Sequence, residues 1–117
     1  MYEIIFYRDR NGKAPTWDYI MELAKRTDKD SRIKSNKIDD YIQALQVYGK
    51  QVGEPYIKHL SGEIWEIRPL RDRILFAAWH KNSFIILHHF IKRTQKTPLR
   101  EIEQAERNLA DYIERNE

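Results

Sequence analysis

The 117-residue chain contains no cysteine, which excludes disulfide bonds and any reaction that depends on a thiolate. It has only four glycines and four prolines, too few for a collagen-like or linker-rich chain. No apolar run approaches the roughly 20 residues that a membrane-spanning helix needs. The opening residues Met1–Phe6 (MYEIIF) lack the basic segment and cleavage site of a signal peptide. We therefore expect a cytoplasmic protein with no membrane partner.

The composition that is present is sufficient for a folded core. Hydrophobic residues make up 41% of the chain, and 14 aromatic residues (three Trp, seven Tyr and four Phe) argue against disorder. The length is that of one ordinary domain, and no linker or internal repeat interrupts it. The sequence predicts a single domain over residues 1–117.

Positive charge is concentrated in one part of the chain. Residues 58–100 hold nine Lys/Arg against three acids, a net charge of +6, whereas the remaining residues carry a net charge of −3. A basic segment within a slightly acidic protein favours a site for a polyanion on one face. A solvated basic surface without a ligand is the alternative.

The first half of the chain has the pattern of one strand and two helices. Residues 2–8 are rich in β-forming residues and end at the turn residues 9–12. Two stretches with apolar residues at helical spacing follow, joined by a short charged segment at 27–31, which predicts an antiparallel helix pair. We expect the buried residues of this pair to include Trp17, Ile20, Met21, Ala24, Ile38, Tyr41, Ile42 and Leu45.

The second half changes to the alternation typical of strands. Residues 64–68, 73–80 and 84–91 read as antiparallel strands, and residues 56–60 as either a short strand or a loop. A last helix is predicted with Thr97 as its N-cap, Pro98 as its first residue and a buried stripe that includes Ala105 and Leu109. The order β-α-α-β-β-β-α predicts an α+β fold, with a small, largely antiparallel sheet of four to five strands packed by helices.

Several basic residues lie at strand ends, where they can converge. Arg68 ends one predicted strand, Arg73 opens the next, and Lys92 and Arg93 follow the last. Guanidinium groups bind phosphate oxygens in a bidentate manner and lysine adds a point charge, so such a rim would bind a phosphodiester. Phe90 could stack an unpaired base. The alternatives are that both arginines pair with nearby carboxylates and that Phe90 belongs to the core.

No metal or cofactor site is apparent in the sequence. His88 and His89 are adjacent, so on a strand they face opposite ways, and His59 and His80 lack the spacing of metal ligands. The four glycines are scattered and form no phosphate-binding loop. We expect no metal and no cofactor, so that any catalysis relies on Arg, Lys and His.

Four runs of residues resemble a known family: Lys58–Leu60 (KHL), Ile64–Arg68 (IWEIR), Arg73–Phe76 (RILF) and Leu87–Pro98 (LHHFIKRTQKTP). They are similar to the phage-derived, HigB-like branch of the RelE/ParE toxin superfamily, which shares K-x-L, L-W-E-L-R and H-x-F-x-K-K-T-x-K-T-P. The chain departs from this pattern at Arg93, where a second Lys is usual, and at His89, where a small residue is common.

The resemblance implies a RelE-like fold and the toxin of a type II toxin–antitoxin pair. Such a toxin is a metal-independent mRNA endoribonuclease on the translating ribosome, which uses the RNA 2′-hydroxyl to attack the adjacent phosphate. The expected partners are a HigA-like helix-turn-helix antitoxin and ribosome-bound mRNA, with operator DNA contacted only through the antitoxin. On this reading the expected catalytic residues are Arg68, Arg73, Lys92 and, as a second choice for proton transfer, His88; the expected RNA-binding residues are Lys58, Arg71, Phe90, Arg93 and Lys96.

Two other functions remain open at this point. A ParE-like toxin of the same fold would poison gyrase and leave mRNA intact. A non-catalytic module would bind nucleic acid as a co-repressor. The basic cluster at the exit of the last predicted strand favours the nuclease.

Overall fold

The computed structural model describes residues 1–117, in which five strands form one sheet in the order β1-β5-β4-β3-β2. The strands are β1 (Glu3–Phe6), β2 (Ile57–Ser61), β3 (Ile64–Ile67), β4 (Asp72–Trp79) and β5 (Ser83–Ile91). β1 pairs with β5 in parallel, and all other pairs are antiparallel. The predicted α+β class and largely antiparallel sheet are confirmed. The segment that the sequence left open between strand and loop is β2.

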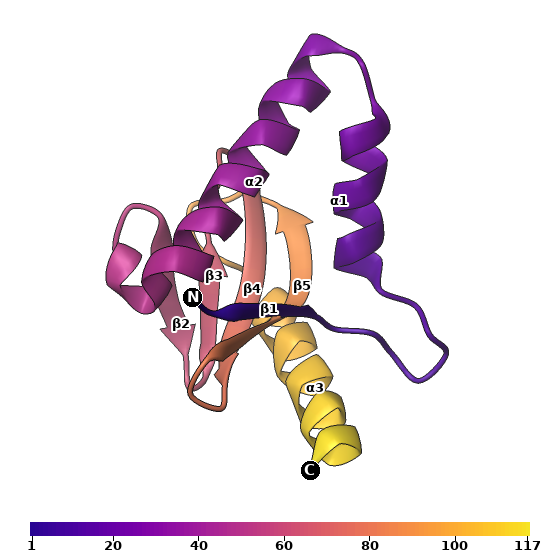
Figure 1. Ribbon diagram of the computed structural model, residues 1–117, viewed down its shortest axis with the longest axis vertical. Helices are drawn as coiled ribbons and strands as arrows, with labels where there is room; N and C mark the ends of the chain where they lie inside the picture. The colour runs from indigo at the N-terminus through magenta and orange to yellow at the C-terminus, as the bar shows by residue number, and fades with distance from the viewer.

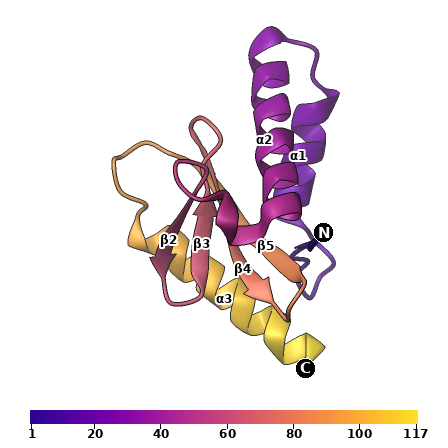
Figure 2. The ribbon, with the colours of Figure 1, turned by 60° about the vertical axis from the view of Figure 1, so that its left-hand side comes forward.

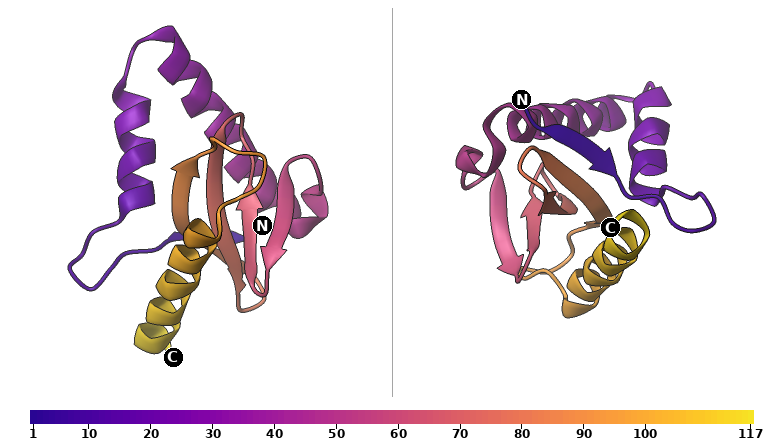
Figure 3. Two further views of the ribbon diagram at one scale, coloured as in Figure 1. Left: turned by 180° about the vertical axis from the view of Figure 1, so that it is seen from behind. Right: turned by 60° about the horizontal axis from the view of Figure 1, so that its bottom comes forward.

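Helices cover both faces of this sheet. α1 (Pro15–Lys25) and α2 (Lys29–Tyr48) form an antiparallel hairpin that extends beyond one end of the sheet (Figure 1). A 3₁₀ turn, η1 (Gly49–Val52), follows α2, and α3 (Leu99–Asn116) ends the chain. The sheet lies between the hairpin and α3 (Figures 2 and 3). None of the helices is long and apolar enough to cross a membrane.

The alternation of side chains along β4 divides the core into two layers. Ile74 and Phe76 pack toward the helical hairpin, while Leu75 and Ala77 pack toward α3, the parity that the sequence predicts. Each of these four side chains is fully buried, and full burial of a large aliphatic or aromatic side chain contributes about 1.5–3 kcal/mol. The sheet therefore holds two apolar layers together.

A bulge in β5 sets which face its last residues occupy. Phe76 of β4 is opposite Ile86, but Leu75 is opposite His88, so that Leu87 is an extra residue. Such an insertion shifts the alternation by one position. As a result His88 and Phe90 lie on the α3 face, and His89 lies on the hairpin face, as their contacts show.

The buried stripe of α1 is displaced from the predicted one. Ile20 is buried as expected, but Trp17 is 41% exposed and Ala24 is also exposed. Thr16 and Leu23 are buried in their place. The prediction for Trp17 and Ala24 was wrong because Leu23 offers the core more apolar surface than Ala24 does, whereas the Trp17 ring lies edge-on to Phe6, 5.0 Å between centroids.

The other helices match the predicted stripes more closely. In α2, Ile38 and Leu45 are fully buried, and Tyr41 and Ile42 are partly buried. The stripe of α3 is confirmed, with Ala105 and Leu109 buried. Its predicted N-cap is not: Pro98 holds that position, and the Thr97 hydroxyl donates instead to Glu66 Oε1 at 2.7 Å. A strand carboxylate within reach competes with the helix end for this hydroxyl.

A polar network joins the end of α3 to the segment after β1. Asp111 accepts hydrogen bonds from Arg115 Nη2 (2.8 Å), Tyr7 (2.6 Å) and Arg10 Nε (2.8 Å). These donors stabilise the carboxylate and hold the pKa of Asp111 well below its ordinary value, with the hydrogen bond from Arg115 as the largest cause.

This network predicts a pH dependence of stability. Because the pKa is depressed in the folded state, its stabilisation is fully present above the unfolded pKa of about 3.9 and is lost as the pH falls below it. We expect Asp111→Asn to flatten the decline of the free energy of unfolding between about pH 5 and about pH 2, measured by urea denaturation. Glu106→Gln, at an exposed position of α3 without an ion pair, is the control. A wild-type slope in Asp111→Asn would contradict this prediction.

Candidate functional site

A cleft of about 210 Å³ gathers most of the predicted site residues at the end of the sheet where β5 leads into residues 92–98. We call it the cation pocket. It is lined by five cationic side chains and one carboxylate, together with smaller polar and apolar groups: Lys58, His59, Leu60, Glu66, Arg68, Arg73, Lys92, Gln95, Lys96, Thr97 and Ile102. The sequence placed Arg68, Arg73 and Lys92 near one another, but it did not show that Lys58 of β2 lines the same cleft.

The strand register explains why these residues meet. Lys58 of β2 is opposite Glu66 of β3, and Glu66 is opposite Leu75 of β4. Arg73 of β4 is opposite Phe90 of β5. Side chains of directly opposed residues lie on the same face of a sheet, here the α3 face. The pocket therefore lies on that face, between the ends of β2 to β5 and the segment that leads into α3.

Arg73 is held firmly at the floor of the cation pocket. Only 6% of the residue is exposed, and its Nη1 donates to the carbonyls of Leu70 and Asp72, at 2.9 Å each. Burial lowers the pKa of its guanidinium, which still remains charged at neutral pH. Neither Nε nor Nη2 makes a hydrogen bond within the protein. The anchored end fixes the group, and the remaining donors are available to a ligand.

Glu66 and Arg68 form an incomplete pair beside Arg73. Glu66 is 2% exposed and accepts the Thr97 hydrogen bond on Oε1, while its Oε2 lies 3.5 Å from Arg68 Nε. Arg68 Nε is buried and makes no hydrogen bond. The expected pairing of Arg68 with a carboxylate is thus present as an ion contact only. A buried donor without a partner costs free energy, and a bound anion would relieve that cost.

The three lysines of the pocket are free of acidic partners. None of Lys58, Lys92 and Lys96 lies within ion-pair distance of a carboxylate. The backbone N–H of Lys92 donates to the Arg71 carbonyl at 2.7 Å, which holds the exit of β5 beside the turn before β4. Arg71 and Arg93 border this turn together with Lys92. The positive charge of the pocket therefore continues around the exit of β5.

His88 and Phe90, two residues predicted for the site, lie outside the cation pocket. His88 Nε2 is 2.8 Å from Glu101 Oε1 at the start of α3, and neither residue lines the cation pocket. Phe90 packs partly against the layer of core under α3. The structure therefore brings together Arg68, Arg73, Lys92, Lys58 and Lys96, but does not bring His88 to them.

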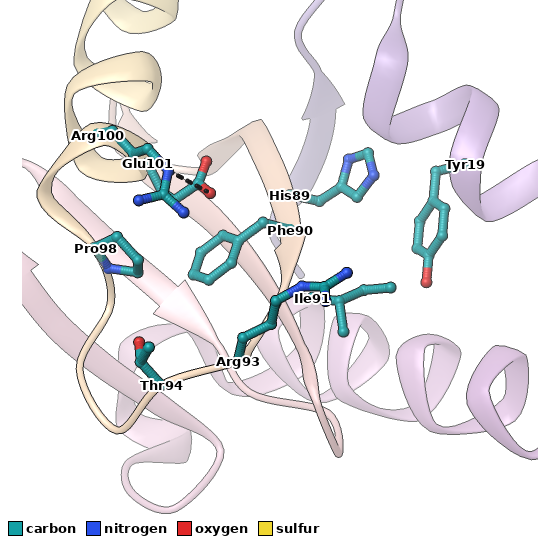
Figure 4. Close-up of a pocket in the computed structure, with 9 residues that line it drawn as sticks. All are labelled: Tyr19, His89, Phe90, Ile91, Arg93, Thr94, Pro98, Arg100 and Glu101. Carbon is teal, nitrogen blue, oxygen red and sulfur yellow. Dashed lines mark ion pairs between the residues drawn. The ribbon is translucent and has the colours of Figure 1, made fainter.

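A second hollow of about 320 Å³ lies against β5, and we call it the edge groove (Figure 4). Its lining residues are Tyr19, His89, Phe90, Ile91, Arg93, Thr94, Pro98, Arg100 and Glu101. His89 stacks on Tyr19, 4.4 Å between ring centroids, and its Nδ1 is 3.2 Å from the Thr16 hydroxyl. Burial lowers the pKa of His89. His88 and His89 face opposite ways, as predicted.

Sequence reasoning missed six of the eleven residues that line the cation pocket: His59, Leu60, Glu66, Gln95, Thr97 and Ile102. Glu66 shares strand parity with Ile64, a buried position, and a carboxylate on an otherwise buried strand face is a signal of a built polar site. His59 lies beside the Trp65 ring, and its Nε2 is 2.8 Å from the Gly62 carbonyl. No three His, Asp or Glu side chains converge to hold a metal ion.

Comparison with known proteins gives one family match. Residues 23–110 match the family described as phage derived protein Gp49-like (DUF891). The matched range runs from within α1 into α3 and contains every residue that lines the cation pocket. No curated protein matches the chain.

Proposed function

The chain belongs to the Gp49-like family of phage-derived proteins, a RelE/HigB-like family of toxins from toxin–antitoxin systems, and from this premise we propose that it is a metal-independent mRNA endoribonuclease that acts on the ribosome. The toxin unit of this proposal is the whole of residues 1–117. A toxin of this kind requires an antitoxin partner, which we propose is a HigA-like helix-turn-helix protein that alone contacts operator DNA.

The observation that carries the proposal is the composition of the cation pocket. Arg68 and Arg73 offer guanidinium donors that no protein group uses, and three unpaired lysines surround them. Guanidinium groups match the oxygens of a phosphodiester, and fixed positive donors stabilise the charge that develops when the phosphate reacts. A cleft that opens to solvent beside a basic surface suits single-stranded RNA.

The proposed reaction uses only the RNA, the protein and solvent water. The 2′-oxygen forms a bond to the adjacent phosphorus, the bond from phosphorus to the 5′-oxygen breaks, and the products are a 2′,3′-cyclic phosphate and a free 5′-hydroxyl. Arg68 and Arg73 bind the phosphate oxygens. Lys92 gives a proton to the leaving 5′-oxygen, and solvent then reprotonates it. Lys58, Arg71, Arg93 and Lys96 bind the RNA backbone, and Phe90 stacks on a base next to the cleaved bond.

We assign removal of the 2′-hydroxyl proton to solvent water. His59 is opposite Trp65, and Trp65 is opposite Phe76, so the His59 ring lies on the hairpin face of the sheet and not on the α3 face that holds the cation pocket. Glu66 lies on the pocket face but is enclosed and already bound to Thr97 and Arg68. His88 was predicted for this role, but its contact with Glu101 places it elsewhere.

Primer extension on cellular mRNA after induced expression tests this function. We expect growth arrest together with new 5′ ends within translated regions, and 2′,3′-cyclic phosphates on the upstream fragments. Lys81→Ala, an exposed position at the turn between β4 and β5, is the control and should cleave as the wild type does. Intact mRNA with damaged DNA would replace the proposal with gyrase poisoning. Intact mRNA without growth arrest would leave a non-catalytic binding module.

A further inference from the structure

The sheet has an open edge next to the cation pocket. β1 pairs only with Ser83–Ile86, the first half of β5. Beyond Ile86 the chain of β1 turns away toward α1, and no strand lies beside residues 87–91 on that side (Figure 1). An open strand edge presents unpaired backbone groups to solvent, to a ligand or to another chain.

The direction of these backbone groups follows from one hydrogen bond. The Lys92 N–H donates to Arg71 on the β4 side. Because N–H and C=O groups alternate sides along a strand, those of Phe90 also point to β4, and those of His89 and Ile91 point to the open side. Earlier in β5, two backbone carbonyls already accept hydrogen bonds from other groups of the protein. The Ile86 carbonyl accepts from the Tyr7 N–H, and the Leu87 carbonyl accepts from Asn108 Nδ2, at 2.8 Å each.

His89 and Ile91 have no such partners. Their backbone groups make no hydrogen bond to β1 or to a side chain, and both residues line the edge groove. Ile91 is 44% exposed, an unusual degree of exposure for a large apolar residue on a strand. Free donors and acceptors on every second residue recur about every 7 Å along this edge. A peptide strand that lies beside the edge has the same two-residue repeat.

The walls of the groove indicate which peptide would fit. Tyr19 of α1 stands on one side, and Pro98 with Arg100 stands on the other (Figure 4). Arg93 is exposed and has no carboxylate partner, and the Arg100 side chain is 78% exposed, with only a long 3.8 Å contact to Glu101. The groove is therefore basic at its rim, and it complements an acidic segment.

We propose that the edge groove binds an extended, acidic polypeptide segment of a protein partner, which pairs with His89 and Ile91 as an added strand. Strand addition uses main-chain hydrogen bonds for affinity and flanking side chains for selectivity. The floor of alternating backbone donors and acceptors favours a peptide over RNA, which offers no matching backbone pattern.

Occupancy of the groove would silence the toxin directly. A bound strand would cover Phe90 and Arg93, which RNA also needs, so the peptide and the RNA would compete. This consequence rests on the proposed function, whereas strand addition itself does not. The toxin's antitoxin partner is the protein expected to supply such a segment.

The test uses the full chain and a defined probe, the peptide acetyl-Glu-Val-Glu-Val-Glu-Val-amide. Amide hydrogen exchange is followed by NMR as the peptide is added. We expect exchange at His89 and Ile91 to slow by about tenfold or more at saturation, because their amides become hydrogen-bonded. Exchange at Phe90, whose amide already faces β4, should change far less. A peptide with Lys in place of Glu is the charge control and should not protect these amides.

Two variants at one position separate strand pairing from side-chain contact. Ile91→Pro removes the outward N–H but no hydrogen bond to β4, and proline is tolerated on such an edge. It should abolish protection of His89, whereas Ile91→Ala keeps the N–H and should retain it. If Ile91→Pro does not fold, as judged by circular dichroism, Arg93→Glu combined with Arg100→Glu replaces it and should exchange the preference from the Glu peptide to the Lys peptide.

The proposal is overturned if the edge amides are unprotected at peptide concentrations up to about 1 mM. It is also overturned if Ile91→Pro is protected as well as the wild type, or if a single-stranded RNA and not the peptide slows these amides. The exchange measurement requires no cleavage. If the protein leaves mRNA intact but the peptide still protects its edge amides, the proposed nuclease function is refuted and peptide binding in the edge groove is supported.

Discussion

Arg73→Ala is expected to reduce mRNA cleavage by about 10²–10³-fold, which corresponds to about 2.7–4 kcal/mol of lost transition-state stabilisation. The reason is the position of the guanidinium at the floor of the cation pocket, with Nη1 fixed by two carbonyls and the other nitrogens unused. A donor that is held before the reaction begins loses little entropy when charge develops on the phosphate. The measurement is the rate at which purified protein cleaves mRNA in a translation extract.

Arg73→Lys tests the shape of the donor separately from its charge. A lysine would keep a positive charge in the pocket but would replace the planar fork with a single point. We expect cleavage to stay well below that of the wild type. Full activity in Arg73→Lys would mean that charge alone is sufficient and that bidentate geometry has no role.

The same two hydrogen bonds give Arg73 a structural role that the experiment must separate from catalysis. Its Nη1 ties the carbonyls of Leu70 and Asp72 together across a turn in which Leu70 has a positive φ of 57°. The thermal midpoint and the circular dichroism of each variant therefore accompany its rate. If Arg73→Ala keeps its fold and still cuts mRNA at the wild-type rate, the catalytic assignment of Arg73 is wrong.

The sequence predicted element types better than the side-chain positions within them. Period-two alternation along β4 and the helical spacing of Ile38 and Leu45 each have one geometric solution, so their burial could be predicted. Trp17 and Ala24 were wrong because one helical stripe can rotate by a residue when a larger neighbour, Leu23, competes for the core. Thr97 was misplaced as a cap because a local rule cannot see Glu66, which is distant in the sequence.

The candidate site shows the same limit at longer range. Arg68, Arg73 and Lys92 could be placed near one another because each flanks a strand end. His88 could not be excluded from them, because its partner Glu101 is on a helix whose packing the sequence does not specify. Strand parity correctly separated His88 from His89. It could not reveal the bulge at Leu87 that places both His88 and Phe90 on the α3 face.

The largest expected effect on stability is that of Glu66→Ala. Glu66 is 2% exposed and is the only acid of the cation pocket. Its removal would leave the Thr97 hydroxyl without an acceptor and Arg68 without its ion contact, and Asp72 would be the one carboxylate that still acts on Arg73. Loss of one partner of a buried ion pair typically costs about 3–5 kcal/mol. We expect a loss of that size in the free energy of unfolding, measured by urea denaturation.

Glu66→Gln divides this effect into its two parts. A glutamine keeps the shape of the side chain and can still accept from Thr97, so only the compensating charge is lost. Its cost should fall between that of Glu66→Ala and that of Glu63→Ala, an exposed position for which a change within about 0.5 kcal/mol is expected. Equal costs for Glu66→Ala and Glu63→Ala would contradict the buried ion contact. Because the Glu66 carboxylate contacts Arg68, it also sets where that guanidinium meets a phosphate, so Glu66→Gln should lower cleavage by more than its loss of stability explains.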